Sequence, residues 1–133
     1  MGGGEPILVL AALLFTAAAA PAQTHMQFIQ QGAKLVGAGA VGQAQQGSSV
    51  AVSADGDTAI VGGPLDSDPN TGAQTGAAWV FTRTNGTWSQ QGTKLVGTGA
   101  LGNAQQGYSV AIAADGNTAI VGGPADDAMT GAA

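Results

Sequence analysis

The apolar residues of this chain fall into short runs that are separated by glycine, aspartate and asparagine. Runs of this length, rich in valine, isoleucine, threonine and aromatic residues, indicate β-strands. We therefore expect four strands in the middle of the chain, at residues 49–53, 58–62, 77–83 and 88–96. Residues 27–36 match the last of these segments, so a strand is expected there as well.

Two dipeptides mark the turns between these strands. Asp55-Gly56 lies between the first two strands, and Asn85-Gly86 lies between the last two. Both pairs suit the positive φ angles of tight hairpin turns. If Asn85-Gly86 is the centre of its turn, Arg83 lies opposite Trp88 and a cation–π contact can form between them.

The chain contains an internal repeat, which decides the fold class. Residues 30–64 recur as residues 90–124, with an offset of 60 positions and 27 identities in 35. The strands at 49–53 and 58–62 carry small or apolar residues on both faces, as strands do when both faces are covered. Their glycine and alanine residues allow neighbouring sheets to approach closely. The sequence thus predicts an all-β protein of four-stranded antiparallel units that stack on one another.

The first 22 residues have the pattern of a secretion signal. Residues 7–20 are almost entirely apolar, but this run of 14 is shorter than the roughly 20 residues that span a bilayer. Ala20-Pro21-Ala22 then supplies a signal peptidase site, with cleavage expected before Gln23. We expect a secreted, periplasmic or cell-surface protein without a membrane span.

The repeat boundaries divide the chain into four segments. They are the signal peptide at 1–22, an N-terminal strand and loop at 23–46, a first repeat at 47–106 and a second repeat at 107–133. The last residues, 131–133, match 76–78, which lead into the third strand of the first repeat. We therefore expect one full unit with parts of two others, truncated from a longer product. Residues 23–133 alone are expected to associate through open sheet edges.

The charge and composition exclude several kinds of function. After residue 22 there are seven aspartates, no glutamate and three basic residues, a formal charge of −4. So few basic residues cannot form the positive surface that nucleic acid requires. The chain has no cysteine, so it has no disulfide framework and no thiolate metal site.

Three elements resemble the FG-GAP repeat, which is found in the β-propeller of integrin α subunits and in many secreted bacterial proteins. They are residues 46–51 (QGSSVA), 58–64 (TAIVGGP) and 76–81 (GAAWVF), and the second copy repeats the first two. Gln-Gly stands where the family has Phe-Gly, and Gly-Gly-Pro stands where it has Gly-Ala-Pro. The resemblance implies a β-propeller of four-stranded blades, in which an N-terminal strand closes the last blade.

The resemblance also implies that calcium is a candidate ligand. Many FG-GAP repeats bind Ca²⁺ in a loop before the Gly-Ala-Pro element, but residues 53–58 of this chain are too short and offer two carboxylates. The loop after that element has oxygen ligands at alternate positions, Asp66, Asp68 and Asn70. These three residues are our candidate calcium ligands; the alternative is a solvated surface loop.

The side chains that could perform catalysis are few. His25 is the sole histidine, and it lies in the stretch just after the expected cleavage site. The sequence has no G-x-S-x-G or H-E-x-x-H motif. A carboxylate pair such as Asp66 and Asp68 could do acid–base work only if burial set their pKa values apart, and nothing in the sequence indicates that. We assign no catalytic residue. Four aromatic residues are expected to pack inside the blades or to stack on sugar rings: Trp79, Phe81, Trp88 and Tyr108.

These observations predict a non-catalytic, exported FG-GAP-like repeat module for binding, adhesion or surface scaffolding. Its expected partners are a protein or carbohydrate ligand and the remaining blades of a longer chain. The alternative is part of a secreted propeller enzyme, a hydrolase or lyase, whose catalytic residues lie outside this sequence.

Overall fold

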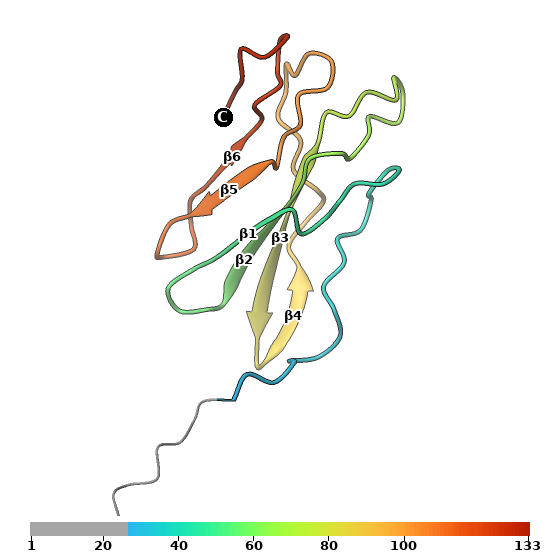
Figure 1. Cartoon of the computed structure of the whole chain (residues 1–133). Coiled ribbons are helices and arrows are strands. Elements are labelled where there is room, and N and C mark those ends of the chain that lie inside the picture. The colour runs from blue at the N-terminus through green and yellow to red at the C-terminus, as the bar shows by residue number, and fades with distance from the viewer. Residues whose placement is uncertain (1–26) are drawn as a thin grey trace, which may run out of the picture.

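The computed structural model describes residues 27–133, and in this part of the chain every regular element is a strand. Figure 1 shows two antiparallel sheets side by side. The first sheet has the order β1-β2-β3-β4 and the second pairs β5 with β6. The strands are β1 (Ser49–Val52), β2 (Thr58–Gly63), β3 (Ala77–Thr84), β4 (Thr87–Gln90), β5 (Ser109–Ile112) and β6 (Ala119–Gly122). The all-β prediction is confirmed, with one four-stranded blade-like sheet and the beginning of a second.

The hairpin between β3 and β4 has the predicted register. Arg83 pairs with Trp88, and Thr84 pairs with Thr87 across the turn. Asn85 and Gly86 have φ angles of 50° and 78°, as both central residues of a type I′ turn require. The Arg83 guanidinium lies 5.6 Å from the centroid of the Trp88 ring, so the expected cation–π contact is present.

The turn between β1 and β2 is longer than a two-residue hairpin. The Gly56 amide donates to the Ser53 carbonyl at 2.9 Å, and of Asp55-Gly56 only Gly56 has a positive φ, 75°. This is a type I turn followed by a left-handed glycine, a common longer hairpin connection. Gly116 occupies the equivalent position between β5 and β6, and its φ angle is 72°.

The prediction of a strand at residues 27–36 is wrong, and the strand predicted at 88–96 is shorter than expected. Residues 27–36 form no strand, and β4 ends at Gln90 with a single further bridge from Leu95 to Ala78. A short segment becomes a strand only by pairing. Asn85-Gly86 folds β4 back onto β3, whereas the described residues offer residues 27–36 no such partner.

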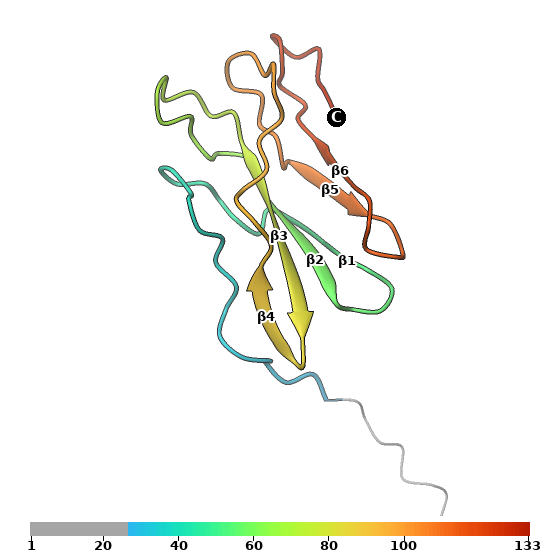
Figure 2. The same cartoon turned by 180° about the vertical axis from the view of Figure 1, so that it is seen from behind.

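One face of the first sheet is covered by the chain that precedes it. Trp79 and Phe81 on β3 are buried, together with Ala44 from that preceding segment. The indole nitrogen of Trp79 donates to the carbonyl of Ala38 at 2.8 Å. In Figure 2 this segment runs along β3 and β4. The core of the first unit is therefore completed by residues outside its sheet.

The opposite face of the first sheet is covered by the second unit. A Cβ added to Gly62 would lie 2.0 Å from the carbonyl oxygen of Gly107, and one added to Gly107 would lie 2.3 Å from that of Ala77. The Ser49 hydroxyl donates to the same Gly107 carbonyl at 2.8 Å. The predicted close approach of sheets through glycine is confirmed at this contact.

The expectation that both faces are covered fails for β1. Val50 and Val52 are 67% and 57% exposed, although β2 and β3 are well buried. Their side chains share a face with Trp79, but β1 is the edge strand and the preceding segment does not reach that far. The described part of the chain contains no helix that could cross a membrane.

Candidate ligand-presenting loops

The two ends of the sheets differ in their connections. One end carries the tight turns at residues 53–57, 85–86 and 113–118, and we call it the turn end. The other end carries the longer connections at 64–76, 91–108 and 123–131, and we call it the loop end. Both views of the cartoon show these longer connections gathered together (Figures 1 and 2).

Asp66, the first of the candidate calcium ligands, is buried at the base of the loop. Its Oδ1 accepts the amide of Val41 at 2.8 Å, and its Oδ2 forms an ion pair with the Lys94 ammonium. Asp126 repeats the first contact in the second unit, where it accepts the amide of Leu101 at 2.7 Å. The Asp66 carboxylate thus fastens the segment before β1 to the loop after β2.

Asp68 and Asn70 have a different role from Asp66. The Oδ1 of Asp68 accepts the amides of Asn70 at 2.7 Å and Thr71 at 3.0 Å, which closes a turn at the tip of the loop. These backbone hydrogen bonds hold the pKa of the Asp68 carboxyl below its ordinary value. The contact to Asn70 is made by its backbone, not by its side-chain oxygen.

Two of the three candidate residues, Asp66 and Asp68, use their carboxylates in contacts within the protein. A calcium ion on Asp66 would have to replace the Lys94 ammonium, because the second oxygen already accepts an amide. Among residues 27–133, no three acidic, histidine or cysteine side chains are grouped so that they could hold a metal ion. Calcium requires six to eight oxygen ligands. These contacts give the loop a structural role, and EDTA and calorimetry test whether it also binds calcium.

The loops of the two units are joined to each other by hydrogen bonds. The amides of Gln105 and Gln106 donate to the carbonyls of Gln74 and Thr75 at 3.2 and 2.8 Å. The amide of Gln74 donates to the side chain of Asn103 at 2.8 Å. These bonds tie residues 64–76 to residues 91–108, so the two loops form one surface.

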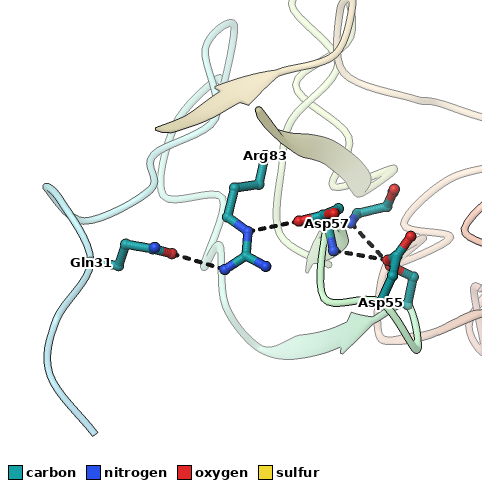
Figure 3. A network of polar contacts seen from close by, with 6 residues as sticks. Gln31, Asp55, Asp57 and Arg83 are labelled. Atoms are coloured by element: carbon teal, nitrogen blue, oxygen red, sulfur yellow. Dashed lines mark hydrogen bonds and ion pairs between the residues drawn. The ribbon is translucent and has the colours of Figure 1, made fainter. Parts of the chain in front are cut away.

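At the turn end, a polar network surrounds Arg83 (Figure 3). Its Nε donates to the Asp57 carboxylate at 2.8 Å, and its Nη1 donates to the side chain of Gln31 at 3.2 Å. Asp55 accepts the Ser53 hydroxyl and the Asp57 amide, and these bonds lower its pKa, the hydroxyl having the larger effect. The network joins Gln31, in the segment before β1, to the sheet, and it pairs the Arg83 guanidinium with the Asp57 carboxylate.

The aromatic residues divide between the core and the surface. Trp79 and Phe81 are buried in the core, and Trp88 packs against it. Tyr108 is 61% exposed and is the last residue of the connection at 91–108. Of the four side chains considered for sugar stacking, Trp79 and Phe81 are therefore packing residues, while Tyr108 stands at the loop end.

Sequence reasoning missed the glutamine that positions the segment before each first strand. Gln46 accepts the Gly37 amide at 2.6 Å and donates to the Gly37 carbonyl at 2.8 Å. Gln106 makes the same pair of bonds with Gly97. The identical Ala-Gln-Gln-Gly in both repeats was the available signal, but spacing alone does not say which backbone group a glutamine binds. His25 and the expected signal peptide lie outside the described residues.

Comparison with known proteins identifies the repeat. The family model described as the FG-GAP repeat matches residues 29–81, which include the segment before β1 and the first three strands through Phe81. No curated protein and no solved structure matches the chain. The match covers the elements on which the sequence resemblance rested, now seen as strands of one antiparallel sheet. Residues 29–81 are therefore an FG-GAP repeat.

Proposed function

We propose that this protein is a non-catalytic binding or scaffolding module, exported from the cell, that presents a ligand surface at the loop end of its stacked sheets. The observation that carries the proposal is the set of hydrogen bonds between residues 64–76 and residues 91–108. Loops held on a rigid β-scaffold are common binding sites. Because the two loops are already fixed to each other, they can hold a ligand between the units without losing further conformational entropy when it binds.

The internal contacts of the first loop support this role. Asp66 anchors its base through Val41 and Lys94, and Asp68 closes its tip. The exposed side chains at the loop end include polar ones, the ring of Tyr108 and the apolar Leu95, Val96, Leu101 and Met129. Such a surface suits a protein or a carbohydrate ligand, since an exposed tyrosine supplies an apolar ring together with a hydroxyl.

A binding screen with matched variants tests the proposal. The purified chain is applied to a printed glycan array and to immobilised fibronectin, collagen and laminin. Replacement of residues 68–71 by Gly-Ser-Gly-Ser, or Tyr108→Ala, should abolish any selective signal while the circular dichroism spectrum is unchanged. The control is Asn117→Ser at the turn end, which should bind as the parent does. Selective binding that survives both loop-end changes would contradict the proposal.

Export is tested separately by fractionation. The full chain, expressed in a bacterial host with a C-terminal tag, should appear outside the cytoplasm with Gln23 as its first residue by mass spectrometry. A variant with Ala20→Leu and Ala22→Leu loses the small residues that signal peptidase requires and should remain unprocessed. A full-length product that stays in the cytoplasm would refute this part of the proposal.

A further inference from the structure

The segment before β1 is tied to the β3–β4 hairpin at two points. Near the turn end, the side-chain oxygen of Gln31 accepts a hydrogen bond from Nη1 of Arg83 at 3.2 Å (Figure 3). Further along the segment, the amide of Ala38 donates to the side-chain oxygen of Gln90 at 2.7 Å. We call residues 32–36, between these two bonds, the strap. Because the chain is fixed to the same hairpin before and after the strap, these bonds set the distance of the strap from the sheet.

A groove lies between the strap and the hairpin, and its volume is about 490 Å³. All five residues of the strap line one wall. The side chains of the other wall come from β3 and β4 and are Phe81, Thr87, Trp88 and Gln90. Both walls therefore belong to residues 31–90 and are complete in the structure.

Apolar side chains predominate in the two walls. Leu35 and Val36 on the strap are 39% and 61% exposed, and Trp88 is only partly buried against the core. Apolar surfaces that face each other across a gap lack the dispersion contacts of a close-packed interior. The volume lies in the range of small-molecule sites in proteins. An apolar body between the strap and Trp88 would therefore gain contacts with both walls.

The charge of the groove comes from Lys34. It is the one charged residue among those that line the groove. The ion pairs within residues 27–133 use the other two basic residues, Arg83 and Lys94, so they leave the Lys34 ammonium available. The chain as a whole has a formal charge of −5. This groove is thus a local exception, where an anionic group on a ligand is favoured.

We propose that the groove between the strap and the β3–β4 hairpin binds a small amphipathic anion, an apolar ring or short chain that carries one carboxylate. The apolar part lies between Leu35 and the Trp88 ring, and the carboxylate pairs with the Lys34 ammonium. Shape and burial supply most of the affinity, and Lys34 selects for the charge.

This site is separate from the ligand surface proposed above. None of the residues that line the groove lies in the connections at 64–76 and 91–108. The screen for glycan and matrix-protein ligands can fail without affecting the binding of an anion in the groove. Failure of the groove to bind leaves the loop-end surface equally untouched.

The test uses the full chain and two probes of nearly equal shape, 3-phenylpropionate and its neutral amide. The chain has two tryptophans, so the indole N–H signal of Trp88 can be followed by nuclear magnetic resonance. We expect 3-phenylpropionate to shift this signal with a dissociation constant on the order of 1–10 mM, as its few atoms allow. The backbone amides of Ile120 and Val121, which line a different groove, should not shift.

Two variants assign the contacts within the groove. Lys34→Met keeps the length of the side chain and removes its charge, so it should weaken 3-phenylpropionate by about two- to fivefold and leave the amide unchanged. Leu35→Asp places a carboxylate at the groove and should abolish binding of the anion. Asn117→Ser is the control and should bind as the parent does. Circular dichroism verifies the fold of each variant, and the Lys34→Met comparison stands even if Leu35→Asp fails to fold.

Four outcomes would overturn the proposal. They are an unmoved Trp88 signal in saturated 3-phenylpropionate, equal binding of the acid and the amide, parental affinity in Lys34→Met, and shifts at Ile120 as large as that at Trp88. A Trp88 signal that moves with protein concentration alone would also overturn it, since a second copy of the chain would then be the occupant.

Discussion

The two repeat units have nearly the same sequence but differ in burial. Ile60 on β2 and Ile120 on β6 occupy equivalent positions, yet Ile60 is 0% exposed and Ile120 is 58% exposed. Ile60 is covered by β3 beside it and by the second unit on its open face. Ile120 has β5 alone as a paired strand.

This difference shows that the burial of a side chain in this protein depends on the segments that pack against its unit, and not only on the sequence of the unit. A four-stranded sheet covers its faces only when another segment lies on each of them. In the first unit those segments are the chain before β1 and the strand β5. Identical residues are therefore core in one unit and surface in the other.

The largest loss of stability should come from Trp79→Ala, in the core of the first unit. The change empties the space that the indole fills beside Gly37 and Gly63 and leaves the Ala38 carbonyl without its donor, so the free energy of unfolding should fall by about 3–5 kcal/mol. Urea denaturation followed by circular dichroism measures the loss. Trp88→Ala is the matched control, and a loss as large as that of Trp79→Ala would contradict the assignment of the core.

The next largest loss of stability is expected at Ile60, and Ile120 at the equivalent position of the second unit serves as its comparison. Ile60→Ala should cost about 2–5 kcal/mol because the side chain is fully buried. Ile120→Ala should cost much less, about 1 kcal/mol or below. Equal losses in urea denaturation would show that the second unit is covered in solution.

A smaller effect is expected from the glycines at the contact between units. Gly62→Ala brings a Cβ within 2.0 Å of the Gly107 backbone and should cost about 1–3 kcal/mol. At Gly122 the nearest atom is the Ser109 hydroxyl, 2.4 Å away, which can rotate. Gly122→Ala should therefore be nearly neutral in melting temperature, and the opposite order would disprove the stacking of the units.

Acid should destabilise the protein slightly. The pKa values of Asp55 and Asp68 are lowered by hydrogen bonds in the folded chain. Their contribution is fully present above the pKa of an unfolded aspartate, about 3.9, and is lost as the pH falls through the lower folded pKa. Melting temperatures between pH 6 and pH 2 should decrease in the acidic part, and less so in Asp68→Asn. An unchanged pH dependence in that variant would rule out the turn at Asp68.

The smallest effect is expected on removal of calcium. Because Asp66 is paired with Lys94 and Asp68 with backbone amides, EDTA should leave the melting temperature unchanged. Calorimetric titration with CaCl₂ provides the second measurement. A calcium-dependent shift that disappears in Asp68→Asn would instead establish the predicted calcium loop.

The sequence was sufficient for β1, β2 and β3 and for the turn between β3 and β4, because these depend on local chemistry. Asn85-Gly86 fixes both the turn and the pairing of Arg83 with Trp88. The roles of the loop residues were not accessible in the same way. Asp66 binds residues 25 and 28 positions away in sequence, and alternate spacing of oxygen atoms cannot distinguish an anchoring carboxylate from a calcium ligand. Residues 27–36 were assigned by similarity to β4, although a strand also needs a partner.

The position of Trp79 has a consequence for how such repeats can be inherited. Its indole lies against Gly37 and donates to the carbonyl of Ala38, and both residues precede β1 in the chain. A gene duplication that began at Ser49 would pass on an indole without the residues that enclose it. One that began near residue 29, where the family match also begins, carries both. Recombination that duplicates such a repeat should therefore keep its break point ahead of Gly37 and Ala38, the residues that enclose the indole.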